Sequence, residues 1–500
     1  MTQELIAVFM FSSMMLMLMT GQRVFGAIGG IAAIAALTLW GTGGSDIPFA
    51  AAMKVMKWYP MLTLPMFIFM GYVLSESKIA DDLYKMFHVW MGPTNGGLAI
   101  GTIGLMVLIS AMNGLSVAGM AIGATIALPE LLRRGYDKKM VTGVIQAGSS
   151  LGILVPPSVV LVLYAMIARQ PVGQLWLAGV FPGLMMAAMF IIYIWLRCKL
   201  NPSLGPALDK KELAEFDLIS KIPVRVNYVV VALMIMVPLF ARYDILSGRD
   251  IMILAVAMVA AFFVIRNNAL FYKDFFVKEK FRLLLSGLLP LVIFFAMMIP
   301  FIKGWTSLVE SSAIGAMTAF FAAVVKGRMT KEVFEVSVRQ TLAISCMFML
   351  IVLAALGFGA VFDGLGAVKA IDSLFREQMG LDPWTILILM QLSFLLMGTF
   401  LDDTAMLVIV APLYVPLVKV LGFDLIWYGV LYTITTQIAY MTPPFGYNLF
   451  LMRAMAPKEI TIMDIYASIV PFVLVMGVAL ATIMMFPEIA LWLPNYIYGR

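Results

Sequence analysis

The chain has 500 residues, of which 62% are hydrophobic and 12% are charged, and its mean hydropathy is +0.99. Soluble domains carry about 25% charged residues, so this composition excludes an ordinary soluble protein. At roughly 20 residues for each membrane crossing, the apolar segments suffice for about a dozen spans. We expect helices, because water cannot satisfy the backbone inside a bilayer and the runs are long rather than alternating. The net charge of +6 fits basic cytoplasmic loops, and nothing indicates a nucleic-acid partner.

The N-terminal apolar run and the two cysteines each restrict the kind of protein further. The apolar run from Leu5 to Met19 has no basic stretch before it, and a cleavable signal peptide needs one, so we expect a retained span. Cys198 and Cys346 lie far apart and form no CxxC pair, which argues against a disulfide or metal framework.

Apolar segments that could form helices can be placed along the whole chain. They are 5–20, 24–41, 60–76, 97–132, 140–168, 175–196, 226–241, 250–265, 283–302, 308–325, 341–362, 384–420, 425–455 and 463–486. Four of them are too long or too interrupted to be single helices. Their interruptions are Asn113–Ser116, Val155–Ser158, Gly398–Thr404 and Thr442–Gly446.

These interruptions recur at a fixed spacing. Gly135 precedes the Pro156-Pro157 pair by 21 residues, and Gly422 precedes Pro443-Pro444 by the same 21. A polar break lies about 21 residues further upstream in each half, at Gly114 and at Leu401-Asp402. Because each Pro-Pro pair removes a helix donor and clashes with the preceding turn, we expect two copies of a hairpin followed by a broken helix.

Charge predicts how the two copies are oriented. The loop of the first copy carries Arg133, Arg134, Lys138 and Lys139, whereas the loop of the second carries only Lys419. The positive-inside rule places the first loop in the cytoplasm and the second outside. Seven membrane crossings separate the two loops when 384–420 is a re-entrant hairpin. Because seven is odd, the loops lie on opposite faces of the membrane, in agreement with the charge rule. The copies are therefore predicted to be inverted repeats, and both termini are predicted to be periplasmic.

Inverted repeats with broken helices near the membrane midplane are typical of secondary transporters. Helix amino ends at that depth attract an anionic group, and free carbonyls coordinate a cation such as sodium. The fold class predicted is thus an all-α polytopic membrane protein with inverted repeats, two re-entrant hairpins and broken helices.

The same residues resemble a known family, the large membrane subunit of TRAP (tripartite ATP-independent periplasmic) transporters. The resemblance runs from about residue 5 to 200 and from 283 to 490. The motifs that carry it are Pro65–Gly71 (PMFIFMG), Leu128–Asp137 (LPELLRRGYD), Gly152–Ser158 (GILVPPS), Leu175–Gly183 (LWLAGVFPG), Gly398–Asp402 (GTFLD) and Thr442–Gly446 (TPPFG).

The resemblance implies an elevator-type, sodium-coupled importer in the bacterial inner membrane, without an organic cofactor. It implies two partners, a small TRAP membrane subunit and a periplasmic substrate-binding protein. The substrate implied is a small organic anion, namely a C4-dicarboxylate, another carboxylate or a sulfonate. The two sodium sites carried over by motif involve Asn113, Ser116, Gly152, Val155 and Pro157 for the first, and Gly398, Ala439, Thr442 and Phe445 for the second.

Four further residues are candidates for substrate binding, each with a structural alternative. Asp402 lies at a hairpin tip at membrane depth, where a carboxylate is usually functional, although it can instead cap the next helix. Arg23 can contact an acidic substrate or extend to the cytoplasmic interface. Ser158 and Thr404 can bind a carboxylate or sulfonate, or can satisfy the backbone that the breaks set free.

The domain organisation predicted is a first transport repeat with scaffold helices over 1–200, a cytoplasmic segment and inserted helical hairpin over 201–282, and the second repeat over 283–500. Two other functions are weighed. An intramembrane enzyme needs a nucleophile–base pair or a metal cluster, and the chain, with one histidine, has no HExxH or GxSxG motif. A channel built on the two hairpins would show flux that cannot be driven uphill.

Overall fold

The computed structural model describes residues 2–20, 22–79, 91, 94–114, 116, 119–120, 123–207, 290, 292–373, 380–398, 403–443 and 446–499. Within those residues every regular element is a helix. Among the described residues, four helices are long and apolar enough to cross a membrane: α11 (Val172–Leu200), α16 (Leu308–Val325), α17 (Lys331–Gly364) and α23 (Ile462–Met485). The all-α prediction is therefore confirmed. The segments 226–241 and 250–265, and with them the predicted crossing count, lie outside the described residues.

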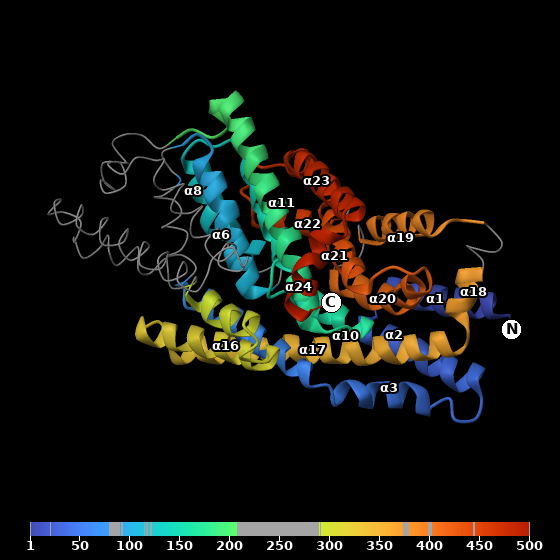
Figure 1. Cartoon of the computed structure of the whole chain (residues 1–500). Coiled ribbons are helices and arrows are strands. Elements are labelled where there is room, and N and C mark those ends of the chain that lie inside the picture. The colour runs from blue at the N-terminus through green and yellow to red at the C-terminus, as the bar shows by residue number, and fades with distance from the viewer. Residues whose placement is uncertain are drawn as a thin grey trace.

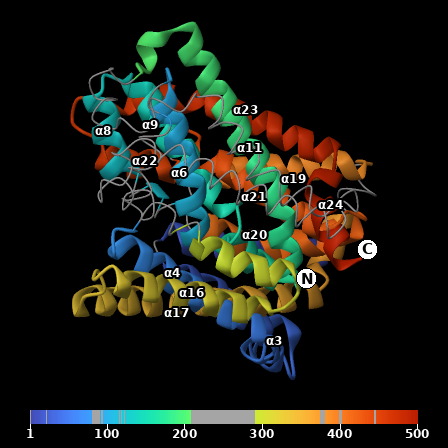
Figure 2. The ribbon, with the colours of Figure 1, turned by 60° about the vertical axis from the view of Figure 1, so that its left-hand side comes forward.

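Five helices form one layer of the molecule. α17 packs against α2 (Val24–Ala35), α3 (Asp46–Met56) and α4 (Thr63–Glu76), and α16 packs against α4. Figure 1 shows α2, α3, α16 and α17 along the lower side of the molecule, and Figure 2 shows the same layer with α4 within it. Helices from the first and the second half of the chain therefore build this layer together.

A second group of helices lies above this layer in Figure 1. α6 (Gly97–Asn113) packs against α9 (Lys138–Ser150), and α23 packs against both α9 and α21 (Leu425–Met441). α11 contacts α6, α21 and α24 (Glu488–Tyr498). α9 and α21 are buried almost throughout, so the two helices that precede the Pro-Pro breaks form the centre of this group.

The outer side of this group is apolar, as expected for contact with lipid. On α23, Phe472 and Met476 are buried against neighbouring helices, whereas Leu474 and Val478 are 65% and 58% exposed. A helix that presents large apolar side chains on both sides is typical of a membrane span, because one side faces protein and the other faces acyl chains.

The fixed spacing of the sequence corresponds to two copies of one local structure. Gly135 and Gly422 both adopt the left-handed region, with φ of +76° and +82°. In each copy the amide after the glycine donates to a carbonyl five residues earlier over 3.1 Å, which is a helix-ending turn. Asp137 and Asp424 then cap α9 and α21, each accepting from the amides two and three residues further on. The repeat is therefore present at atomic detail, offset by 287 positions.

The helices around these turns correspond as well. In the first copy α8 (Leu128–Arg133) leads into the turn and α6 packs on α9; in the second, α20 (Asp403–Val420) leads into it and α19 (Pro383–Gly398) packs on α21. All four predicted interruptions separate helices. The helix breaks predicted from polar and Pro-Pro interruptions are confirmed.

Three helices were not expected from hydropathy, namely α3, α18 (Ala367–Ser373) and α24. They are short or carry charge, so a search for long apolar runs passes over them. The segment predicted as 341–362 is wrong in length, because α17 begins at Lys331. Thr330 caps that helix by accepting from the amide of Val333, and its first polar turns lie outside any apolar window.

Candidate functional site

The break in the first broken helix is fixed by hydrogen bonds of the Ser158 side chain. α9 ends at Ser150, a short 3₁₀ turn covers Leu151–Ile153, and α10 (Val159–Ala168) begins after the Pro-Pro pair. Ser158 caps α10, because its hydroxyl accepts from the amide of Leu161 at 3.2 Å and donates to the carbonyl of Ile153. The indole of Trp176 donates to the carbonyl of Ser158 at 3.3 Å. The break is thus a fixed structure rather than a simple kink.

At this break several buried main-chain oxygens have no hydrogen-bond partner among the described residues. The carbonyls of Gly152, Val155 and Pro157 accept no hydrogen bond from a described residue outside the helices, although all three residues are buried. Free carbonyls at a helix break are ligands for a small hard cation. The three residues that the resemblance assigned to a sodium site therefore have unused oxygens close together in the chain.

The tip of the first hairpin lies directly on this break. The amide of Val159 donates to the carbonyl of Gly114 at 3.2 Å. Gly114 has φ of +65°, and a Cβ there would lie 2.8 Å from the carbonyl oxygen of Pro157. The structure therefore places Gly114, within the predicted Asn113–Ser116 tip, against the Pro157 carbonyl of the break. The side chain of Asn113 lies outside the described residues.

At the second break, the end of α19 lies beside the last turn of α21. Gly398 lies against Ala439, because a side chain at 398 would run into the Cβ of Ala439. The amide of Thr442 donates to the carbonyl of Ala439 at 3.0 Å, and its hydroxyl donates to the carbonyl of Ile438 at 2.6 Å. The hydroxyl hydrogen is thereby used, which leaves the lone pairs of the Thr442 oxygen available as a ligand. Phe445 lies outside the described residues.

Two buried side-chain amides link the repeats, and no local sequence pattern indicates either of them, because their partners are more than 280 positions away. Gln437 donates through Nε2 to the carbonyl of Ser150 at 3.0 Å, across 287 positions. That number is the repeat offset, so Gln437 contacts its own equivalent, as expected near an axis that relates the copies. Asn448 donates through Nδ2 to the Ser116 hydroxyl at 3.1 Å.

The substrate candidates are dispersed. Arg23 is exposed, immediately before α2, and makes no ion pair with a described residue. Ser158 is buried and engaged as a cap. Thr404 lies in the first turn of α20, with its side chain outside the described residues, and Asp402 lies outside them entirely. Their proposed roles stay predictions.

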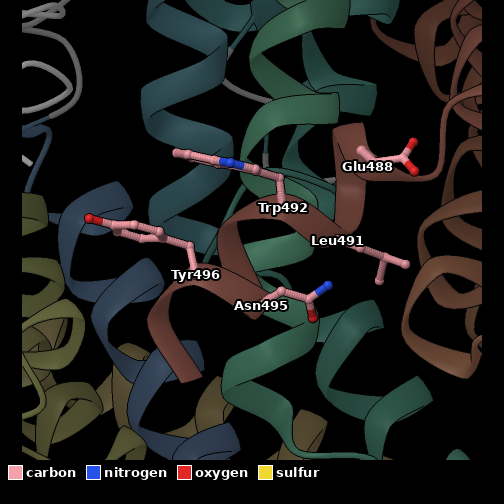
Figure 3. Close-up of a pocket in the computed structure, with 5 residues that line it drawn as sticks. All are labelled: Glu488, Leu491, Trp492, Asn495 and Tyr496. Carbon is pink, nitrogen blue, oxygen red and sulfur yellow. The ribbon is translucent and has the colours of Figure 1, made fainter. Parts of the chain in front are cut away.

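One surface pocket lies apart from all of these residues. Figure 3 shows it along one face of α24, lined by Glu488, Leu491, Trp492, Asn495 and Tyr496. The indole of Trp492 and the ring of Tyr496 are stacked, 5.4 Å apart. No residue of the predicted sodium or substrate sites lines this pocket, so it is not part of the candidate transport site.

A polytopic helical protein with a buried broken helix in each of two repeats has the architecture of a secondary transporter. The family model described as "Tripartite ATP-independent periplasmic transporter, DctM component" matches residues 11–489. The chain belongs to that family and is a TRAP transporter large permease subunit.

Curated relatives and a solved structure are similar to the chain over most of its length. The C4-dicarboxylate TRAP transporter large permease protein DctM of Pseudomonas aeruginosa is 26% identical over 88% of this chain and 87% of its own. The ectoine TRAP transporter large permease protein TeaC of Halomonas elongata is 24% identical, over 88% of this chain and 87% of its own.

A third relative is longer than this chain. The isethionate TRAP transporter permease protein DctMQ of Oleidesulfovibrio alaskensis is 21% identical over 87% of this chain but 58% of its own. Among solved structures, the YdaH transporter of Alcanivorax borkumensis, described as having an unusual topology, matches with a TM-score of 0.58 at 13% identity, over 96% of this chain and 99% of that one. That likeness supports the fold alone.

Proposed function

We propose that this chain is a sodium-coupled importer subunit for a small organic anion, a carboxylate or a sulfonate. Sodium ions enter at the two breaks, one at the first hairpin tip and the Pro156-Pro157 break, and one at Gly398 and Thr442. The chain performs transport and catalyses no chemical conversion. Its relatives are permeases, and no cluster of three metal-ligating side chains lies among the described residues.

The observation that carries this proposal is the first break. Three buried carbonyls, those of Gly152, Val155 and Pro157, are free of described partners, and the Gly114 tip packs on the last of them. Hard cations take oxygen ligands, and main-chain carbonyls supply them without a side-chain charge. The donors present therefore fit sodium.

The transport cycle that we propose is of the elevator type. The layer of α2, α3, α4, α16 and α17 stays fixed against the membrane, and the group around α9 and α21 carries the substrate. In support of this division, α2, α3 and α4 pack on α17 and α16 packs on α4, whereas α6 packs on α9 and α19 packs on α21.

Two partners belong to the proposal. A small membrane subunit would complete the permease. The relative DctMQ is named for two components, and this chain covers 58% of its length. A periplasmic binding protein would deliver the anion, as the family description states a periplasmic transporter in three parts. We place the complex in the inner membrane, with both termini on the periplasmic side.

Uptake into proteoliposomes tests the proposal. The vesicles contain this chain and the small subunit, the binding protein is supplied outside, and radiolabelled succinate and isethionate serve as probes of the carboxylate and sulfonate classes. We expect uptake of one of them that requires an inward sodium gradient and the binding protein. Uptake that is equally fast with sodium absent would refute the coupling, and downhill flux that cannot be driven uphill would favour a channel.

A further inference from the structure

The last helix of the chain, α24, begins where a membrane span ends. Only Phe486 and Pro487 separate it from α23, which is long and apolar enough to cross a membrane. With its 11 residues, α24 is about 16 Å long. That is too short to cross a hydrocarbon core about 30 Å thick. The helix therefore starts near the level of the lipid headgroups.

One side of α24 packs on the protein, and another side lines the pocket of Figure 3. Ala490 and Pro494 are buried, and the helix contacts α11. The pocket has a volume of about 360 Å³, which lies within the range of small-molecule sites. In its wall the ring of Trp492 stacks on Tyr496 and meets the ring of Phe181 edge-on. These contacts hold the aromatic wall in place before any ligand binds.

The pocket combines one negative charge with neutral hydrogen-bond donors. Glu488 is the only charged residue that lines it, and its carboxylate makes no ion pair with a described residue. The side-chain amide of Asn495 has no hydrogen-bond partner among the described residues either. The two residues lie seven positions apart, which is about 10 Å along a helix. A ligand that fits both ends has a cationic group at one end and a hydrogen-bond acceptor at the other.

An exposed apolar strip on α23 leads to the start of α24. Leu474, Val478 and Met485 are all exposed, and their spacings of four and seven residues place them on one side of the helix. Phe486, which follows directly, is exposed as well. Acyl chains cover a strip of this kind in a membrane. A lipid that lies along it has its headgroup near Glu488.

We propose that the pocket on α24 binds the headgroup of an aminophospholipid, phosphatidylethanolamine, whose acyl chains lie along α23. The ammonium group donates to the Glu488 carboxylate, and the phosphate accepts from the Asn495 amide. The paired rings of Trp492 and Tyr496 form the wall beside the headgroup. The bound lipid thereby joins α24 to the surface of the bilayer.

The charge of Glu488 makes this site selective among lipids. A primary ammonium group has three N–H donors and forms charge-assisted hydrogen bonds with a carboxylate. The trimethylammonium group of phosphatidylcholine has the same charge but no donor. In phosphatidylglycerol the phosphate is the only charge, and Glu488 repels it. Tryptophan and tyrosine at a membrane surface interact with headgroups in general, so the rings alone predict equal binding of all three lipids.

Thermal unfolding of the full-length chain in detergent tests the proposal. Delipidated protein is titrated with phosphatidylethanolamine, phosphatidylcholine or phosphatidylglycerol of identical acyl chains, and the shift of the unfolding midpoint gives an apparent dissociation constant for each lipid. Glu488→Gln removes the charge with little change of shape, and Glu488→Lys reverses it. The matched control is Glu459→Gln, because Glu459 is exposed at the other end of α23, between α22 (Tyr447–Met455) and α23.

We expect the wild type to bind phosphatidylethanolamine most tightly and phosphatidylglycerol least. Glu488→Gln raises the apparent dissociation constant for phosphatidylethanolamine about tenfold, and Glu488→Lys binds phosphatidylglycerol most tightly of the three. Asn495→Ala weakens all three lipids alike, because each of them has the phosphate. Glu459→Gln keeps the affinities of the wild type.

Equal affinity of the wild type for the three lipids, or a preference for phosphatidylglycerol, would overturn the inference. An unchanged affinity for phosphatidylethanolamine in Glu488→Gln would do so as well, and so would an equal loss in Glu459→Gln. A glutamate in the first turn also stabilises its helix. If Glu488→Gln lowered the midpoint by the same amount with and without lipid, that helix effect would be its whole role, and the lipid site would be refuted. None of these results bears on the proposed sodium coupling.

Discussion

Replacing Gly114 by alanine should separate the hairpin tip from the first break. Gly114 has φ of +65°, and an added Cβ would lie 2.8 Å from the Pro157 oxygen and 3.1 Å from the Val159 nitrogen. The left-handed backbone costs about 1 kcal/mol with a Cβ, and displacing the tip would lose the Val159–Gly114 hydrogen bond, worth about 1 kcal/mol. With about 1 kcal/mol more for overpacking, we expect the free energy of unfolding to fall by about 3 kcal/mol. We also expect a weakened response to sodium.

Gly135→Ala and Gly422→Ala are matched controls. Both glycines have similar positive φ, but nothing lies within 4 Å of a Cβ at either position, so each substitution should cost only about 1 kcal/mol. The free energy of unfolding is measured by denaturant titration in mixed micelles, with sodium or potassium present. If Gly114→Ala costs no more than the controls and keeps the sodium response, the tip does not contact the break as described.

Three further predictions concern the sites. Thr442→Ala and Ser116→Ala should each weaken the dependence of uptake on sodium more than they reduce the amount of folded protein. An unchanged sodium response in both variants would contradict the assignment of these two ligands. Ser158→Ala should reduce stability by about 1 to 2 kcal/mol, because the first turn of α10 loses its cap, while sodium dependence measured on the remaining folded protein persists. Gln437→Leu should lower the unfolding midpoint by removing the hydrogen bond to Ser150 and should leave the anion affinity unchanged, as a binding titration with succinate and isethionate would show.

The sequence predicted the local architecture well because its signals are local. Pro-Pro pairs and polar tips interrupt a membrane helix wherever they occur, so the breaks at Val155–Ser158 and Thr442–Gly446 were predictable without any partner. Gly135 and Asp137, like Gly422 and Asp424, specify a helix end and a helix start within three positions. The recurrence of these signals at one spacing was sufficient to find the repeat.

Short and polar helices escaped the same reasoning. α3 contains Asp46 and Lys54, and the first turns of α17 carry Lys331 and Glu332. Hydropathy registers apolar runs, whereas helices at a membrane surface are formed by caps and by packing against neighbours. Their presence depends on contacts that a linear window does not contain.

The sequence by itself determined the class of protein and the presence of the two broken helices, because chain geometry and backbone solvation act over a few neighbouring positions. It placed the first break at Val155–Ser158, whereas α9 already ends at Ser150. Only the tertiary structure decided which of those breaks meet. It placed Gly114 on Pro157, Gln437 on Ser150 and Asn448 on Ser116. It also showed that α10 begins with a side-chain cap from Ser158, whereas Gly446 at the start of α22 supplies none. The physical reason is that buried hydrogen bonds between distant segments depend on packing, which no local pattern of residue types records.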